Sequence, residues 1–244
     1  MSEYRSEAGH GSSGPSPNPA AVFGAVSAHD EKAVPSVSVV VPAYNEAANL
    51  PDLVAEITAA LEPVTSFEIV VVDDGSSDDS KSVAQSLAAS EPRLRCLVHK
   101  RNSGQSAALW TGVIAARAET IATLDGDGQN DPASIPPLLA RFRELDAVGL
   151  EVIVCGIRTN RRDSASKRWA SRIANGVRRR WLDDEVTDTG CGLKVFSRGA
   201  FLTLPAFNHM HRFLPALYKA AGARIDAMPV NHRPRLAGES KYGL

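Results

Sequence analysis

The sequence predicts an α/β fold with a mixed, mostly parallel β-sheet and helices on both faces. Strand-like and helix-like patterns alternate four times after Pro35 with short connections, which is typical of successive β–α units. The expected strands are continuous runs of β-branched residues such as "VSVVVP", a pattern that indicates burial on both faces of a parallel sheet.

The first half of the chain contains four expected strands, "VSVVVP", "FEIVVVDD", "LRCLVHK" and "TIATLDGD". The helix after the first strand has an apolar stripe at helical spacing, and Asn45 is its candidate N-cap. Ser76 or Ser77 is expected to open the second helix. The third helix, "GQSAALWTGVIAARA", is rich in small residues and suited to close packing, and Pro132 stands near the start of the fourth.

The second half is less regular. It has an expected strand "EVIVCGIR", a strongly basic helix from Ser164 to Trp181, a strand "GCGLKVFSR", a helix "HRFLPALYKAAG" and a final strand "ARIDAMPVNHR". Residues 1–34 include "GHGSSGPSPNP" and lack periodic apolar residues, so we expect a disordered tail there. The remainder, residues 35–244, is expected to form a single domain.

Composition excludes several classes of protein. The formal net charge of −1 argues against a polycation that seeks nucleic acid. Three widely spaced cysteines form neither a disulfide framework nor a zinc ligand set, which favours a reducing cytosol. No apolar run is long enough to span a membrane or to act as a signal peptide. The phosphate loops of P-loop ATPases and of dinucleotide-binding dehydrogenases are absent.

Acidic side chains follow three of the expected strands. Glu46 comes after the first strand, Asp73 and Asp74 end the second, and Asp125 and Asp127 end the fourth. In parallel α/β sheets the carboxyl ends of the strands lie at one edge, and ligands bind there. The sequence therefore predicts one acidic site at that edge.

The spacing of Asp125 and Asp127 predicts a metal site. Residues i and i+2 of an extended strand point to the same side, and two carboxylates so close need a cation or a shared proton. Mg²⁺ or Mn²⁺ suits oxygen ligands, and Gln129 would add another. Gly126 and Gly128 permit close approach of a ligand. An isolated D-x-D is more often a turn before a helix, but three acidic strand ends favour a metal–nucleotide site.

Four segments, in this order and spacing, resemble the GT-A catalytic domain of family 2 glycosyltransferases: "VSVVVPAYNEAANL", "IVVVDDGSSDDS", "NSGQSAALWTGV" and "TLDGDGQNDP". Within the family the sequence is most similar to dolichyl-phosphate mannose synthases and related polyprenyl-phosphate glycosyltransferases. The resemblance implies a GT-A (Rossmann-like) fold. Its nucleotide-binding half would cover about residues 35–150 and its acceptor-side half about residues 151–244.

The resemblance implies three groups of site residues in the first half of the chain. They are Pro42, Tyr44 and Glu46 for the base and ribose, Asp73 and Asp74 for the nucleoside, and Asp125, Asp127 and Gln129 for the metal on the diphosphate. On the residues alone, packing explains Tyr44 equally well. Glu46 is explained equally well as an acid that favours the dipole of the helix after it.

A basic segment lies in the second half. From Arg158 to Arg180 there are nine Lys or Arg residues and one acid. Arg168, Arg172 and Arg179 fall on one helical face. A solvated charged face and nucleic-acid binding are the alternatives, and the latter is disfavoured because few aromatic residues lie on the arginine face. The resemblance implies that Arg158 and Arg172 face the phosphate of the lipid acceptor or the donor diphosphate.

Two further motifs complete the expected acceptor side. The resemblance makes Asp188 of "DTGCGLK" a candidate general base, although a phosphate acceptor is already ionised and would need Asp188 only for positioning. In "NHRPRLAGESKYG" it implies that Arg235, Ser240 and Lys241 help to close the site, assisted by the neighbouring His232–Arg233 pair.

Together these features predict a metal-dependent, inverting glycosyltransferase that moves a hexose from a nucleotide sugar to a polyprenyl phosphate. GDP-mannose is the expected donor and Mg²⁺ or Mn²⁺ the expected cofactor. Another nucleotide sugar, a hydroxyl acceptor, a nucleotidyltransferase and a non-catalytic nucleotide-sugar-binding module are the alternatives. We expect a cytoplasmic protein without its own membrane anchor, bound peripherally at the cytoplasmic membrane face through its basic segment and released by salt.

Overall fold

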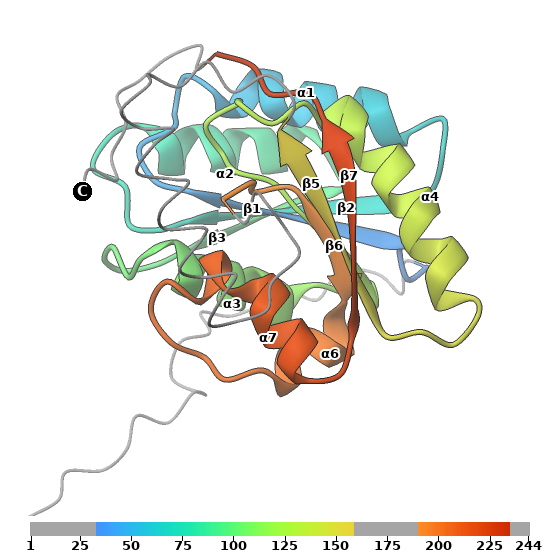
Figure 1. Ribbon diagram of the computed structural model, residues 1–244. Coiled ribbons are helices and arrows are strands. Elements are labelled where there is room, and N and C mark those ends of the chain that lie inside the picture. The colour runs from blue at the N-terminus through green and yellow to red at the C-terminus, as the bar shows by residue number, and fades with distance from the viewer. Residues whose placement is uncertain (1–32, 159–189, 235–244) are drawn as a thin grey trace, which may run out of the picture. The chain divides into compact units, whose positions relative to one another are not determined.

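The computed structural model describes residues 33–158 and 190–234, whose central element is a seven-stranded sheet (Figure 1). The strands are β1 (Val37–Ala43), β2 (Phe67–Asp73), β3 (Leu94–Val98), β4 (Thr120–Thr123), β5 (Val152–Arg158), β6 (Lys194–Ser197) and β7 (Arg224–Val230). Their order is β3-β2-β1-β4-β6-β5-β7. Only β6 runs antiparallel to its neighbours, β4 and β5. The predicted mixed, mostly parallel sheet is therefore confirmed.

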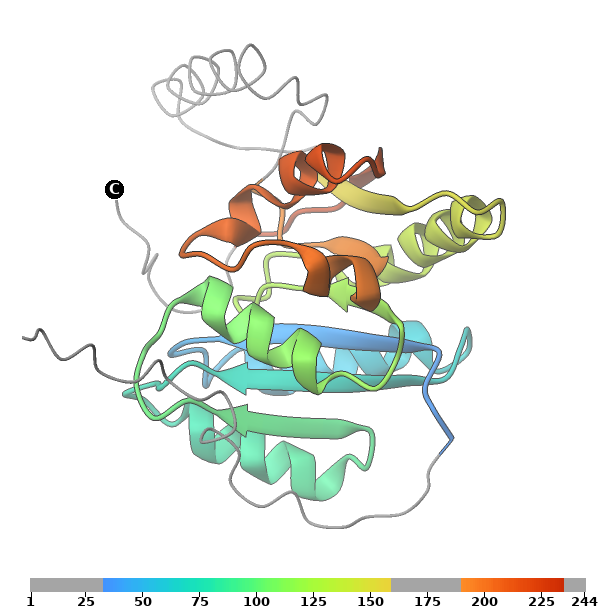
Figure 2. The same cartoon turned by 90° about the horizontal axis from the view of Figure 1, so that it is seen from below.

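Helices cover both faces of this sheet, as predicted (Figures 1 and 2). They are α1 (Leu50–Leu61), α2 (Ser80–Ser90), α3 (Gln105–Ala115), α4 (Ile135–Asp146), α6 (Arg198–Thr203) and α7 (Leu214–Ala220), with short 3₁₀ turns η2 (Pro132–Ser134) and η3 (Met210–Arg212). One apolar core lies between the sheet and α1, α2 and α4. A second core lies between the sheet and α3, α6 and α7.

The β-branched pattern of β1 explains its central position. Val39 and Val41 point into the first core and Val40 into the second, so this strand is buried on both faces. The small residues of α3 let that helix lie close to the sheet. A Cβ atom at Gly112 would approach Cγ1 of Val40 to 2.3 Å, which leaves room for glycine only.

The starts of two helices differ from the prediction because the loops before them bind each other. The N-cap of α1 is Asn49 and not Asn45. Asn45 has a φ of 56°, and its side-chain oxygen accepts from the backbone N–H of Ser77 at 2.8 Å. Its own N–H donates to Oγ of Ser76 at 2.8 Å. Both serines are thus used between loops, and α2 begins only at Ser80.

Several expectations lie outside the described residues. These are the disordered tail up to residue 32, the basic helix and the "DTG" of the acceptor-side motif within residues 159–189, and the C-terminal motif from residue 235 onward. None of the helices that the structure describes is long and apolar enough to cross a membrane.

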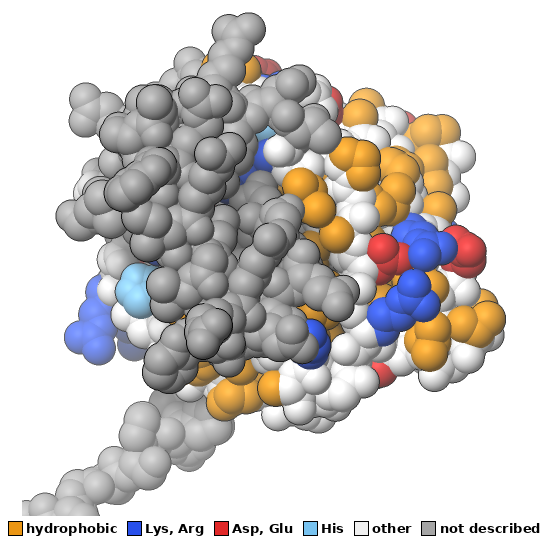
Figure 3. Space-filling view, viewed as in Figure 1, with side chains coloured by type: hydrophobic (Ala, Val, Ile, Leu, Met, Phe, Trp, Pro, Cys, Tyr) orange, Lys and Arg blue, Asp and Glu red, His pale blue; other side chains and the backbone are white. Residues whose placement is uncertain are grey.

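Charged side chains tie the outer helix α4 to the edge strand β7. Figure 3 shows basic and acidic side chains gathered over these two elements. Arg141 of α4 donates through Nε to Asp226 of β7 at 2.7 Å and through Nη1 to Glu144 at 2.9 Å. The acceptor-side half of the sheet is therefore fixed to the same helix that follows the acidic end of β4.

The buried carboxylate of Glu68 links β2 to β1 and to the loop that precedes β4. Glu68 of β2 is fully buried and accepts from Oγ of Ser38 and the N–H of Arg117, both at 2.6 Å. Burial alone would raise the pKa of Glu68, but these hydrogen bonds and the charges of Arg95 and Arg117 hold it below its ordinary value.

We expect Glu68→Gln to lower the free energy of unfolding by about 2–3 kcal/mol at pH 7, because it removes a charge-assisted acceptor. A depressed carboxyl pKa contributes stability above its ordinary value and loses it as pH falls. The difference between variant and wild type should therefore shrink below about pH 4. Urea titrations at pH 7 and pH 3.5 measure it, and an equal difference at both would contradict this account.

Candidate active site

Two adjoining pockets open at the carboxyl ends of β1, β2 and β4. One of them brings together six residues that the sequence predicts for the site, Pro42, Tyr44, Glu46, Asp74, Asp125 and Asp127. The two other predicted residues of this half do not line it. Asp73 is buried beneath the edge, and the Gln129 side chain donates to the backbone oxygen of Arg233 at 3.5 Å.

The two carboxylates after β2 have different surroundings. Asp74 accepts from Nδ1 of His99 at 2.7 Å and from the backbone N–H groups of Ser103 and Gly104 at 2.9 and 2.8 Å. Asp73 accepts from one backbone N–H at 3.3 Å, and its Oδ1 has no hydrogen-bond partner among the described residues. Asp74 therefore organises the loop before α3, whereas Asp73 keeps one buried oxygen without a partner among the described residues.

The contacts of Asp74 fix the start of α3. His99 also makes a hydrogen bond through Nε2 with Oγ1 of Thr111 at 2.9 Å, which joins the end of β3 to this helix. The loop folds back so closely that a Cβ atom at Gly75 would come within 2.4 Å of the Arg101 carbonyl carbon. The helix that begins at Gln105 is held in place by this network.

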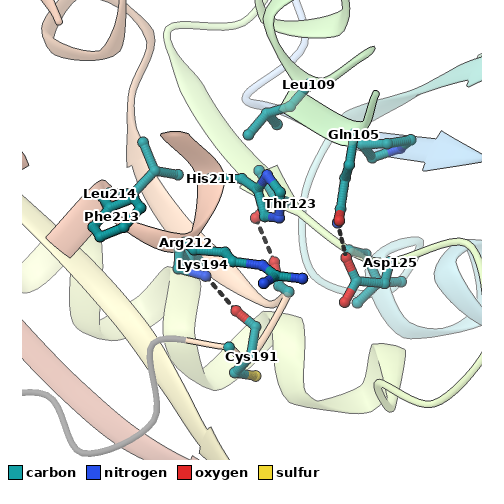
Figure 4. A pocket seen from close by; sticks show the side chains of 14 residues that line it. Gln105, Leu109, Thr123, Asp125, Cys191, Lys194, His211, Arg212, Phe213 and Leu214 are labelled. Carbon is teal, nitrogen blue, oxygen red and sulfur yellow. Dashed lines mark hydrogen bonds between the residues drawn. The ribbon is translucent and has the colours of Figure 1, made fainter. Parts of the chain in front are cut away.

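Gln105 in turn holds Asp125. Its Nε2 donates to Oδ1 of Asp125 at 2.7 Å (Figure 4). The backbone of Gly192 packs against the other side of this carboxylate. A Cβ atom at Gly192 would come within 2.2 Å of Oδ2, so the position of Asp125 requires glycine there.

The strand that carries the D-x-D pattern is shorter than predicted. β4 ends at Thr123, and residues 126–128 form a turn, so extended-strand geometry is the wrong explanation for the pairing of the two acids. Gly128 has a φ of 70°, which a turn of this kind permits glycine to adopt. Asp127 nevertheless lies near enough to raise the pKa of Asp125.

Charge and burial act on Asp125 in opposite directions. Burial is the largest cause and Asp127 the second of a rise in the pKa of Asp125 to about 6. Lys194 and Arg158 lower it, as does the hydrogen bond from Gln105. Arg158, the last residue of β5, therefore lies close to the predicted metal ligands, as a phosphate-facing residue would.

These residues fit a divalent metal ion. Asp125 and Asp127 offer carboxylate oxygens at the edge of a pocket, and a bound cation would offset the burial and the repulsion that raise the pKa of Asp125. No group of three His, Cys, Asp or Glu side chains within the described part of the chain is arranged around a metal. The two aspartates would thus leave coordination positions for water and phosphate oxygens, as Mg²⁺ and Mn²⁺ commonly keep.

The second pocket lies on the acceptor side of Asp125 and encloses about 390 Å³. It shares Pro42, Gln105 and Asp125 with the first pocket. Its other walls are Leu109, Thr123, Leu124, Gly190, Cys191, Gly192, Lys194, His211, Arg212, Phe213 and Leu214. Lys194 is nearly fully buried and donates through Nζ to the backbone oxygen of Cys191. Two cationic side chains, Lys194 and Arg212, therefore line a cavity next to a carboxylate pair.

His211 contributes a neutral wall to this cavity. Burial is the main cause that lowers the pKa of His211 to about 3, and the charges of Lys194, Arg212 and His209 add to it. Its Nδ1 makes a hydrogen bond with Oγ of Ser106 in α3 at 2.8 Å. His211 thus ties η3 to α3 and carries no charge at neutral pH.

Sequence reasoning missed Gln105, Lys194, His211 and Arg212. The segment "NSGQSAALWTGV" carries part of the family resemblance, but without a role for its glutamine. "GCGLKVFSR" and "HRFLPALYKAAG" predict secondary structure alone. The sequence did offer one signal for this part of the site, the pair of glycines on either side of Cys191. Glycines often mark places where the backbone approaches another group closely.

Arg233 does not lie free to assist a substrate, contrary to expectation. Its two Nη atoms donate to the carboxylate of Glu56 in α1 at 2.9 Å, and Nη2 also donates to Asp131 at 2.9 Å. Its backbone N–H donates to the oxygen of Gln129 at 2.8 Å. Arg233 therefore clamps the loop after Asp127 onto α1. Arg172, Asp188, Arg235, Ser240 and Lys241 lie outside the described residues.

We expect Gly192→Ala to weaken Mn²⁺ binding about 10- to 100-fold, the range seen when residues that orient metal ligands are changed. The added methyl group must displace the Asp125 carboxylate and break its hydrogen bond from Gln105. Isothermal titration with Mn²⁺ measures the change. Gly199→Ala is the matched control, since its methyl group would meet the Glu119 carboxylate at 3.0 Å and Oγ of Ser197 at 3.7 Å and no residue that lines either pocket. Equal affinities in both variants would contradict the proposed packing.

We expect Asp125→Asn to stabilise the metal-free protein at pH 7.5. The pKa of Asp125 is about 6 in the folded protein, against an ordinary carboxyl value of 3.8. Between these two pH values, folded Asp125 keeps a proton that the unfolded chain releases, so the free energy of unfolding falls as the pH rises. The asparagine variant should lack that fall. Mn²⁺ should raise the melting temperature of the wild type alone. Thermal melts in EDTA and in Mn²⁺ at pH 4, 6 and 7.5 test both points; a wild-type Tm that is independent of pH would disprove the first.

Comparison with known proteins agrees with this geometry. The family described as "Glycosyl transferase family 2" matches residues 38–204. Undecaprenyl-phosphate 4-deoxy-4-formamido-L-arabinose transferase of Pseudomonas fluorescens (strain SBW25) is 36% identical over 208 residues, 84% of this chain and 60% of that protein. The protein of that name from Pseudomonas paraeruginosa (strain DSM 24068 / PA7) is 38% identical over 209 residues, again 84% and 60%. The chain thus spans about three fifths of these relatives.

Solved structures share the fold. Glucosyl-3-phosphoglycerate synthase from Mycobacterium tuberculosis, in complex with Mg²⁺ and UDP, superposes with a TM-score of 0.64 at 21% identity, over 82% of this chain and 72% of that one. Its complex with Mn²⁺, UDP and glucosyl-3-phosphoglycerate gives 0.63 at 21% identity, over 82% and 73%. The predicted GT-A fold is confirmed by these structures. The family match covers residues 38–204, and this chain therefore belongs to glycosyl transferase family 2.

Proposed function

We propose that this protein transfers a sugar from a nucleotide-activated donor to a polyprenyl phosphate, in a reaction that depends on a divalent metal. The observation that carries the proposal is the junction of two pockets at Asp125. One pocket presents the carboxylates of Asp125 and Asp127, and the other presents the cations of Lys194 and Arg212. Such a site accommodates a metal-bound diphosphate beside a second phosphate.

The names of the relatives support a particular donor sugar and acceptor. They specify 4-deoxy-4-formamido-L-arabinose and undecaprenyl phosphate, and they do not support the GDP-mannose expected from sequence. UDP in the similar solved structures favours a uridine nucleotide. We therefore propose UDP-linked 4-deoxy-4-formamido-L-arabinose as donor, undecaprenyl phosphate as acceptor, and contact with the cytoplasmic face of the membrane that holds this lipid.

Each predicted residue of the first pocket has a place in this proposal. Pro42, Tyr44, Glu46 and Asp74 line it and would surround the base and ribose. Asp73 lies buried beneath the pocket, and its contact with the nucleoside remains a prediction. Asp125 and Asp127, with Gln129 as a further oxygen ligand, would hold the metal. A bound Mg²⁺ or Mn²⁺ supplies positive charge to the leaving diphosphate.

The transfer needs little proton chemistry from the protein. An oxygen of the acceptor phosphate forms a bond to the anomeric carbon on the face opposite the leaving group. The bond from that carbon to the diphosphate oxygen breaks, and the nucleoside diphosphate leaves with the electron pair, so the configuration inverts. A phosphate monoester has its second pKa near about 6 and is already largely dianionic at pH 7, so no base has to remove a proton.

The residues of the second pocket orient this acceptor. Lys194, Arg212 and Arg158 would bind its phosphate oxygens and hold one of them toward the anomeric carbon, a gain of orientation and charge stabilisation. Sequence reasoning adds Arg172, Asp188, Arg235, Ser240 and Lys241 to the acceptor side. These five roles, and a single domain over residues 35–244, remain part of the proposal.

We expect Arg212→Ala to lower kcat/KM for a prenyl phosphate acceptor about 10- to 150-fold, the equivalent of one charge-assisted hydrogen bond of about 1.5–3 kcal/mol. Arg224→Ala, at the exposed start of β7 on the other edge of the sheet, is the matched control and should leave kcat/KM unchanged. Formation of glycolipid from UDP-sugars with Mn²⁺ is the measurement. Transfer to a sugar hydroxyl without transfer to undecaprenyl phosphate would refute the proposed acceptor.

A further inference from the structure

Two exposed phenylalanine rings lie next to each other beside the second pocket, which Phe213 lines. Phe207 is 43% exposed and Phe213 39% exposed. Their ring centroids lie 6.2 Å apart, so they form one aromatic surface. The other large hydrophobic side chains that are exposed in the described part of the chain are aliphatic. An exposed aromatic pair beside a functional cavity is unusual for a surface without a ligand.

The segment that carries these rings is firmly held. Met210 and Leu214 are buried in the second core, and the backbone N–H of His211 donates to Oγ of Ser106 at 3.3 Å. Phe213 therefore stands next to the buried Leu214, and the backbone oxygen of Phe207 accepts from the N–H of the buried Met210 at 3.2 Å. Exposure of the rings follows from the path of the chain from Phe207 into α7, and not from looseness of the loop.

The cavity changes character along its length. Figure 4 shows Asp125 and Gln105 at one side, Phe213 and Leu214 at the opposite side, and the basic side chains between them. The site thus offers carboxylates, then cations, then apolar groups. This order of groups along the pocket matches an acceptor in which a phosphate is joined to a hydrocarbon chain.

We propose that Phe207 and Phe213 bind the first isoprene units of the acceptor's polyprenyl chain while Arg212 and Lys194 hold its phosphate. This inference rests on the proposed function and adds the residues that select a lipid phosphate over a water-soluble one. Two rings are too small a surface for a stable protein partner, which buries about 800 Å² on each side. They are sufficient for a short apolar segment whose charged end is bound next to them.

The test compares binding of farnesyl phosphate and of inorganic phosphate by isothermal titration. F207S/F213S should weaken farnesyl phosphate binding at least about tenfold and leave inorganic phosphate unchanged, because only the apolar contact is lost. F207L/F213L should stay within about threefold of wild type, since leucine keeps the apolar surface. V148S/L150S removes exposed apolar side chains between α4 and β5, away from the pocket, and should change neither affinity.

The outcomes separate this inference from the proposed function. Equal farnesyl phosphate affinity in wild type and F207S/F213S overturns the inference, as does a wild type that binds both probes equally. Loss of affinity in V148S/L150S of the same size would also overturn it. If the wild type binds farnesyl phosphate through the two phenylalanines but never glycosylates undecaprenyl phosphate, the proposed function fails and the docking surface stands.

Discussion

Repulsion between Asp125 and Asp127 at the end of β4 is the constraint on which the arrangement of the site depends. Two carboxylates at a partly buried sheet edge require donors and positive charge. Gln105 supplies a hydrogen bond, Lys194 and Arg158 supply charge, and the pKa of Asp125 still stays near 6. A divalent cation would offset the burial and repulsion that remain, which supports the proposal that these two aspartates hold the metal.

The other acidic strand end serves this one indirectly. Asp74 fixes the loop from His99 to Gly104 and thereby the first residue of α3, Gln105, which holds Asp125. An acid that resembles a nucleotide ligand in sequence thus acts mainly as an internal acceptor. Its neighbour Asp73 retains an unpartnered oxygen among the described residues. Two adjacent aspartates therefore have different surroundings, which spacing alone does not reveal.

Local pattern was sufficient to predict the sheet, because β1, β2 and β4 are rich in buried apolar residues and are followed by acidic residues that a parallel arrangement brings together. It was insufficient where long-range order decides. Lys194 reaches the site only because β6 inserts antiparallel between β4 and β5. Arg233 is removed from the site because α1 offers it Glu56. Asn45 does not cap α1, because its backbone N–H donates to Ser76, 31 residues further along the chain.

The two pockets are coupled through charge, because Asp125 lines both of them. Lys194 and Arg158 interact with Asp125 while Lys194 also lines the cavity of the second pocket. A cation bound at Asp125 and Asp127 cancels the negative charge that attracts these basic groups, and their field toward the second pocket grows accordingly. A divalent cation by itself would therefore increase the attraction of the second pocket for an anion. The effect follows from Asp127, Lys194 and Arg158, the three charged groups placed around the Asp125 carboxylate.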